Sequence, residues 1–165
     1  MPHTLAPWID RARPASDVLN PATGAVCVAW AAKRYQRETA EAMPWALAFL
    51  VAPLTLHAPT RVRYPRSIAT HFPRWISENA EVLAGFSRRA SSFVPYVQEA
   101  LRYGLRSELL ELGHAGSLSA TIADHTKIPE HTELRSIATA SALTGGWFAK
   151  SGSVENVFMQ LGVTP

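Results

Sequence analysis

The sequence predicts a mainly α-helical domain that carries one small β-hairpin. Apolar residues recur at helical spacing in several segments, and most of these segments begin at a capping residue. The thirteen residues 44–56 contain no charge and are apolar on every face, which is typical of a helix inside a bundle or under a partner protein. Two short apolar runs within 109–122 flank a glycine-containing turn, which favours a winged-helix-like hairpin.

The composition indicates one globular domain. A chain of 165 residues is long enough for one shared core, and 47% hydrophobic against 18% charged residues excludes a disordered chain. We expect residues 1–19, with three prolines, to form an irregular leader and residues 20–165 to form a single helical domain. The block 44–56 is shorter than the roughly 20 apolar residues that cross a bilayer, and the start lacks a secretory signal pattern. Together with the single cysteine, this predicts a cytoplasmic protein without membrane contact.

The first half of the predicted domain is strongly apolar. Asn20 followed by Pro21 is typical of a helix start, and the helix that follows is apolar or small all round until its final turns. Cys27 lies in this helix, so we expect it to be a buried small residue rather than a nucleophile. Pro53 interrupts the block 44–56 and is expected to kink its helix or end it.

The second half is predicted to contain short helical pieces after residue 57 and then longer helices. A helix is expected over 95–110, followed by the hairpin, a helix over 132–150 and a last helix from 153 to 162. A helix that leads into a small hairpin is the outline of a winged-helix unit. Gly145 and Gly146 each cost about 1 kcal/mol of helix stability, and close packing against another helix is one reason to keep them.

No motif for catalysis is found. The sequence contains neither a glycine-rich loop ending in Lys-Ser or Lys-Thr nor a Gly-x-Ser-x-Gly turn. His114, His125 and His131, with Asp124 and Glu130, match no zinc-ligand spacing, so this segment reads as a polar linker. We therefore expect a protein that is not an enzyme and that uses no cofactor, metal or small-molecule substrate.

Two sets of residues are candidates for binding. The apolar first half predicts contacts with a partner protein, for which the candidates are Val26, Trp30, Trp45, Phe49 and Leu50. Eight arginines against three glutamates between residues 61 and 106 predict a face for nucleic acid or an acidic partner, since a guanidinium pairs well with phosphate and carboxylate. These candidates are Arg61, Arg63, Arg66, Arg74, Arg88, Arg89, Arg102 and Arg106. An ordinary solvated face is the alternative interpretation of the same arginines.

Five stretches of the chain together resemble a bacterial family. They are MPWALAFLVAPLTLH (43–57), YPRS (64–67), ENAEVLAGFSRRASSFVPYVQEAL (78–101), GGWFAKSGS (145–153) and VFMQLGVTP (157–165). In this order and spacing they are similar to the middle component of three-component ABC systems, the small accessory subunit of Lamassu-type anti-phage defence complexes. The chain departs from that pattern at Pro73 and over 117–132.

The resemblance implies a non-catalytic adaptor. Such a subunit links an SMC-like ABC ATPase to an effector, often a nuclease, in a hetero-oligomer that contacts DNA through the complex. The alternative from the residues themselves is a winged-helix-type nucleic-acid-binding protein that contacts the DNA backbone through its arginines. Salt separates the two, because phosphate contacts weaken steeply as salt rises whereas apolar assembly persists.

Overall fold

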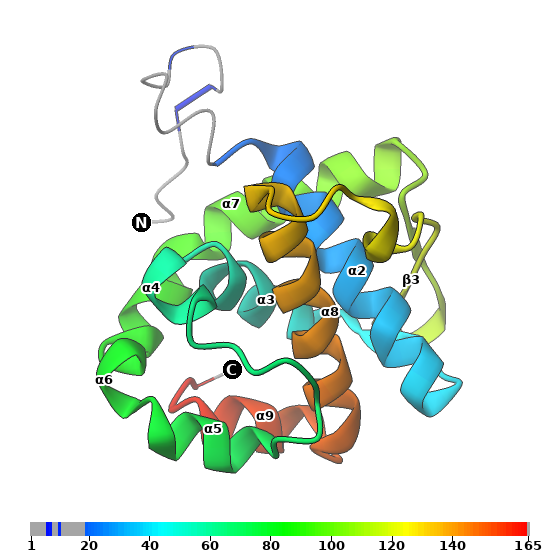
Figure 1. Ribbon diagram of the computed structural model, residues 1–165. Helices are drawn as coiled ribbons and strands as arrows, with labels where there is room; N and C mark the ends of the chain where they lie inside the picture. Colours follow the sequence, from blue (N-terminus) through cyan, green and yellow to red (C-terminus); the bar gives the residue numbers. More distant parts are fainter. Residues whose placement is uncertain (1–5, 8–9, 11–18, 165) are drawn as a thin grey trace.

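The computed structural model describes residues 6–7, 10 and 19–164, which form eight α-helices and a small three-stranded antiparallel sheet (Figure 1). This confirms the predicted class, mainly α with one hairpin. Most of the predicted leader, 1–19, lies outside the described residues.

The elements follow one another along the chain with short connections. The α-helices are α2 (Pro21–Thr39), α3 (Ala48–Thr55), α4 (Ala58–Arg61), α5 (Phe72–Glu78), α6 (Ala80–Leu83), α7 (Phe86–Arg106), α8 (Glu133–Lys150) and α9 (Val154–Gln160). The strands are β1 (Met43–Pro44), β2 (Leu110–Leu112) and β3 (Ser117–Ala120), and the 3-10 turns are η2 (Trp45–Leu47), η3 (His114–Gly116) and η4 (His125–Lys127).

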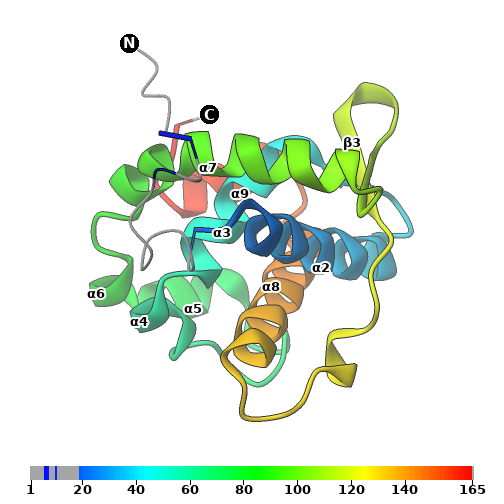
Figure 2. The same cartoon turned by 90° about the horizontal axis from the view of Figure 1, so that it is seen from above.

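Helices α2 and α8 pack against each other at the centre of the molecule, and α7 lies across α2 (Figures 1 and 2). Gly145 makes the close approach of α2 and α8 possible. A Cβ atom at this position would lie 2.0 Å from the backbone oxygen of Ala31 in α2, which is far inside van der Waals contact. The predicted reason for a glycine here, close helix packing, is confirmed.

Side-chain caps set the starts of three helices where the sequence predicts them. Asn20, Thr132 and Ser153 each accept a hydrogen bond from a backbone N–H in the first turn of α2, α8 and α9, at 2.9–3.2 Å. The last helix ends before Gly162, which has a φ of 64° in the left-handed region that favours glycine. These caps satisfy orphan N–H groups that would otherwise oppose helix formation.

Two prolines lie inside helices. Helix α3 continues for two residues beyond Pro53, and it is buried along nearly its whole length. The expected helix start at residue 95 is wrong, because α7 begins at Phe86 and includes Pro95 in its interior. Phe86 and Ala90 are buried in the core, and this apolar packing offsets the hydrogen bond that the proline removes.

The sheet joins the predicted hairpin to a strand that the sequence did not reveal. Strands β2 and β3 pair antiparallel, with Leu112 opposite Leu118, and confirm the hairpin within 109–122. On its other edge β3 pairs with β1, where Met43 lies opposite Leu118. Both side chains are buried, so the sheet attaches the hairpin to the helical core.

An aromatic cluster holds the segment between α4 and α5 against α8. Trp147 in α8 packs on Tyr64, Phe72 and Trp75, with ring centroids 4.8–5.2 Å apart. The Trp147 indole N–H donates to the backbone oxygen of Thr70 at 2.8 Å. The cluster therefore stabilises a region that otherwise contains only short helices.

Candidate partner-binding surface

An apolar groove of about 420 Å³ lies between the start of α3, the middle of α7 and the end of the described chain. It is lined by Trp45, Ala46, Phe49, Leu50, Ala90, Ser91, Val94, Gln98, Phe158, Val163 and Thr164. A second hollow adjoins it, since Phe158, Val163 and Thr164 line both. Apart from three neutral polar residues, every residue of the groove is apolar, which is the lining expected for a buried hydrophobic contact.

Trp45 forms one wall of this groove and is 49% exposed. Its ring packs edge-on against Phe49, with centroids 5.6 Å apart and planes at 79°. On its other side lies Gly116 in the turn between β2 and β3, where a Cβ atom would be 2.4 Å from the indole ring. The pairing of β1 with β3 thus places a large apolar side chain at the surface in a defined position.

The other predicted apolar candidates lie deeper. Trp30 is 6% exposed and Leu50 is 1% exposed, so both belong mainly to the core, although Leu50 contributes to the groove floor. Val26 and Phe49 are half-buried. The structure therefore brings Trp45, Phe49 and Leu50 together, whereas Val26 and Trp30 are on α2 and are not part of the groove.

Sequence reasoning missed the contribution of the chain end. Met159 in α9 is 70% exposed, and its neighbour Phe158 lies between the two hollows. On α7, Ala90 and Val94 are four residues apart, a spacing that places them on one helical face toward the groove. Ala90 and Val94 lie outside the helices predicted from the sequence, and local patterns could not show that separate elements meet around an opening.

Two of the eight candidate arginines stabilise the end of α3. Arg61 is buried, and its Nη1 donates to the backbone oxygen of Thr55 at 2.9 Å, while its Nη2 pairs with Glu133 at 2.9 Å. Arg89 Nε donates to the backbone oxygen of Pro53 at 3.2 Å. These guanidinium groups satisfy carbonyls that the helix end leaves without partners, and they complement its dipole.

The other six arginines are distributed over α5, α7 and the residues after α4. Arg63 pairs with Glu81 at 3.0 Å, and Arg74 on α5 pairs with Glu78 at 2.7 Å. Arg66 is exposed in the connection between α4 and α5. The remaining candidates, Arg88, Arg102 and Arg106, are exposed along α7. Nucleic-acid binding through all eight arginines at once is therefore not favoured by their positions, and their role stays a prediction.

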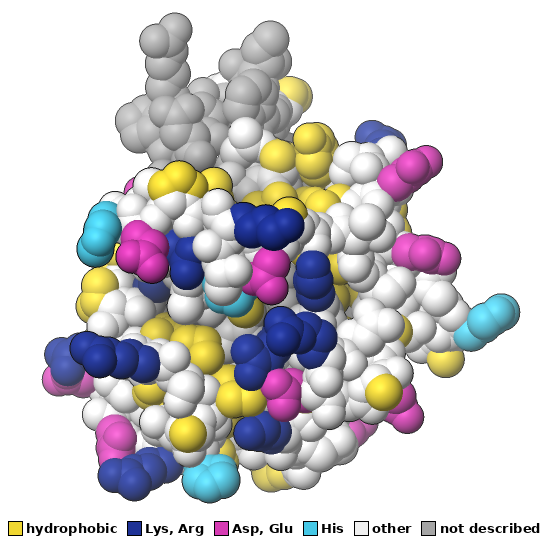
Figure 3. Space-filling model, turned by 45° about the vertical axis from the view of Figure 1, so that its right-hand side comes forward, with side chains coloured by type: hydrophobic (Ala, Val, Ile, Leu, Met, Phe, Trp, Pro, Cys, Tyr) yellow, Lys and Arg dark blue, Asp and Glu magenta, His cyan; other side chains and the backbone are white. Residues whose placement is uncertain are grey.

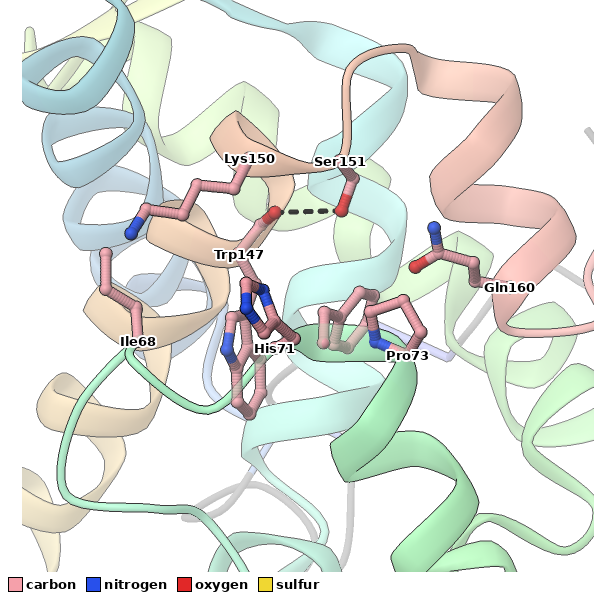
Figure 4. Close-up of a pocket in the computed structure, with 8 residues that line it drawn as sticks. Ile68, His71, Pro73, Trp147, Lys150, Ser151 and Gln160 are labelled. Atoms are coloured by element: carbon pink, nitrogen blue, oxygen red, sulfur yellow. Dashed lines mark hydrogen bonds between the residues drawn. The ribbon is translucent and has the colours of Figure 1, made fainter.

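Figure 4 shows a more polar pocket of about 260 Å³ beside Trp147. The Ser151 hydroxyl donates to the Trp147 backbone oxygen at 2.8 Å. Gln160 contributes a buried side-chain oxygen that has no hydrogen-bond partner among the described residues. The Lys150 ammonium extends to the side of the pocket away from Gln160, so the polar groups do not converge as a ligand site requires (Figure 4).

Two titratable groups in the interior of the described chain, Cys27 and Tyr64, have raised pKa values. Burial raises the pKa of the Cys27 thiol to about 11, which keeps it protonated and unreactive at neutral pH. Burial also raises the pKa of Tyr64, whose hydroxyl shares a 2.7 Å hydrogen bond with Thr144. No three His, Cys, Asp or Glu side chains within the described ranges gather in a way that would hold a metal ion. Over the same part of the chain, no helix is both long and apolar enough to span a bilayer.

The described residues thus form a helical domain with an apolar groove at its surface. A family model described as ABC-three component (ABC-3C) system Middle Component 3 matches residues 8–165, and the chain belongs to this family. A middle component of a multi-component system has partner subunits. No curated protein and no solved structure matches the chain.

Proposed function

We propose that the protein is a non-catalytic adaptor that links an SMC-like ABC ATPase to an effector in a Lamassu-type anti-phage defence complex. Membership of the middle-component family supports a role among partner subunits. The observation that carries the proposal is the apolar groove, because a rigidly held tryptophan at its wall is 49% exposed in the isolated chain. Half-exposed tryptophans beside a pocket are typical centres of protein interfaces.

The groove fits one kind of occupant, an amphipathic helix of a partner subunit. Its floor and walls come from η2 and the start of α3, from α7, and from α9 with the residues after it, so apolar side chains bound the opening on three sides. A volume of about 420 Å³ accommodates a few aliphatic or aromatic side chains, as in complexes in which residues at i, i+3 or i+4, and i+7 enter a groove. Ser91, Gln98 and Thr164 lie among the lining residues and provide hydrogen-bonding groups for the edge of such a contact.

Co-purification tests this function directly. The tagged chain is co-expressed with the two neighbouring open reading frames and purified at about 1 M salt, where charges are screened beyond about 3 Å. We expect the ATPase and the effector to remain bound, because apolar burial does not weaken with salt. A chain that elutes alone at both low and high salt would contradict the adaptor role. Partners that are retained only at low salt would contradict the groove as their contact.

A further inference from the structure

A second surface, formed by the end of α2, by η4 and by α8, carries six cations. These cations are Lys33, Arg34, Arg37, Lys127, Arg135 and Lys150. Figure 3 shows Lys and Arg side chains across the middle of this face, with acidic side chains between them. We refer to this set of six residues as the α2–α8 basic face.

Specific contacts tie the basic face together. Lys33 donates to the backbone oxygen of Ile122, and Arg135 Nη1 donates to the backbone oxygens of Thr126 and Ile128 at 2.8 and 2.7 Å. Lys127 is the residue between the two carbonyls that Arg135 binds. These bonds hold the segment 122–128 against α2 and α8 without neutralising any charge, because their acceptors are backbone carbonyls.

Two further contacts extend the face along α8. The Arg34 side chain lies against α8, where a Cβ atom at Gly146 would be 3.5 Å from Arg34 Cγ, and Lys150 is one turn further along the same helix. Two carboxylates pair within the face, Glu38 with Arg34 at 2.7 Å and Asp124 with Arg37 at 3.9 Å. Six cations against two carboxylates leave the face strongly positive.

His125 lies among the cations of the basic face. Its ring lines a shallow cleft with Trp30, Lys33 and Arg37. Partial burial lowers the pKa of His125; the nearby Asp124 opposes this shift, and Arg135, Arg34 and Arg37 lower it further. The lowered pKa keeps the His125 imidazole neutral at pH 7, and the carboxylate of Asp124 also lines this cleft.

We propose that the α2–α8 basic face binds the phosphate backbone of duplex nucleic acid. The face is rich in Lys and Arg, and of the seven large hydrophobic residues that are exposed in the described chain, only Leu134 is on α8. Protein interfaces are depleted in Lys and use apolar anchors, whereas phosphate recognition needs charge without apolar burial. Trp30 is buried in the cleft, so it offers no platform for stacking the bases of a single strand.

Fluorescence anisotropy with labelled duplex DNA, and in parallel duplex RNA, tests this proposal. We expect binding for which a plot of the logarithm of the association constant against the logarithm of the salt concentration has a slope of about −2 to −4. This slope corresponds to two to four phosphate contacts. In the double variant Arg37→Gln/Lys127→Gln, the slope should decrease in magnitude by about 2, because each lost contact removes about 1. Both side chains are exposed, so the variant should fold. The two duplexes show whether the backbone of DNA, of RNA or of both is bound.

The matched control is Arg63→Gln/Arg74→Gln, which removes two exposed arginines with acidic partners from another part of the molecule. The control should bind like the unmodified chain. If both double variants bound the duplex more weakly to the same extent, the effect would come from net charge alone and the proposal would be overturned. A loss of duplex affinity that appears only in the double variant Arg102→Gln/Arg106→Gln would overturn the proposal and assign the binding to α7. Binding of poly-glutamate as tight as that of duplex would overturn it in favour of an acidic protein partner. Absence of duplex binding at low salt would overturn it as well.

Discussion

Replacing Trp147 with alanine should lower the free energy of unfolding by about 3–5 kcal/mol, the range for a fully buried tryptophan. The side chain is 1% exposed and packs on three aromatic rings from the segment 64–75. Its removal also leaves the Thr70 carbonyl without its indole donor. Small domains have only about 5–15 kcal/mol of total stability, so urea unfolding followed by circular dichroism should show a large drop in the midpoint.

Trp147→Phe is the comparison that separates packing from hydrogen bonding. Phenylalanine keeps an aromatic ring in the cluster but cannot donate a hydrogen bond to Thr70. The free energy of unfolding should therefore fall less in Trp147→Phe than in Trp147→Ala. A Trp147→Ala protein that unfolds like the unmodified chain but no longer assembles with partners would contradict the core assignment, and it would move Trp147 to an interface.

The second large effect is expected from Gly145→Ala. Alanine is the better helix former by about 1 kcal/mol, so propensity alone predicts stabilisation. The added Cβ would, however, lie 2.0 Å from the Ala31 oxygen and 2.8 Å from the Ala31 Cα, and a helix backbone cannot rotate away as a side chain does. We expect α2 and α8 to separate locally, with a net loss of about 1–3 kcal/mol or more in urea unfolding.

Gly146→Ala is the matched control, one residue along the same helix. There the added Cβ would lie 2.9 Å from the Ile68 Cγ2 and 3.3 Å from its Cδ1, which are side-chain rather than backbone atoms. This variant should lose less stability than Gly145→Ala. If both alanine variants unfolded at the same denaturant concentration, the close approach of α2 and α8 at Gly145 would be refuted.

Local signals predicted the helices that begin at a cap. Each capping side chain accepts a hydrogen bond from a backbone N–H only two or three residues further along the chain, as at Asn20, Thr132 and Ser153. Both partners of the interaction are therefore visible in a short stretch of sequence. The start of α7 could not be found this way, because Phe86 and Ala90 owe their helical state to packing on the rest of the core, across a proline that propensity alone would treat as a boundary. Tertiary contacts override local preference at such positions.

The binding surfaces were less predictable than the helices, for a related reason. Arg61 is charged and was expected at a surface, but its partners Thr55 and Glu133 are six and seventy-two residues away in the chain. The α2–α8 basic face likewise gathers residues from 33 to 150, of which only Lys33, Arg34 and Arg37 are close together in the sequence. Trp45 was predicted from its apolar neighbourhood, but its exposure depends on the pairing of β1 with β3.

The groove beside Trp45 is proposed to bind a partner subunit, and the affinity of Trp45→Ala for the co-purified partner tests this contact. Leu134→Ala is the matched control, since Leu134 is 47% exposed, close to the 49% of Trp45, and is on α8 rather than in the groove. We predict that Trp45→Ala binds the partner about thirtyfold more weakly, corresponding to about 2 kcal/mol, while Leu134→Ala binds normally and both variants remain folded. Equal, unchanged affinity of the two variants would contradict the claim.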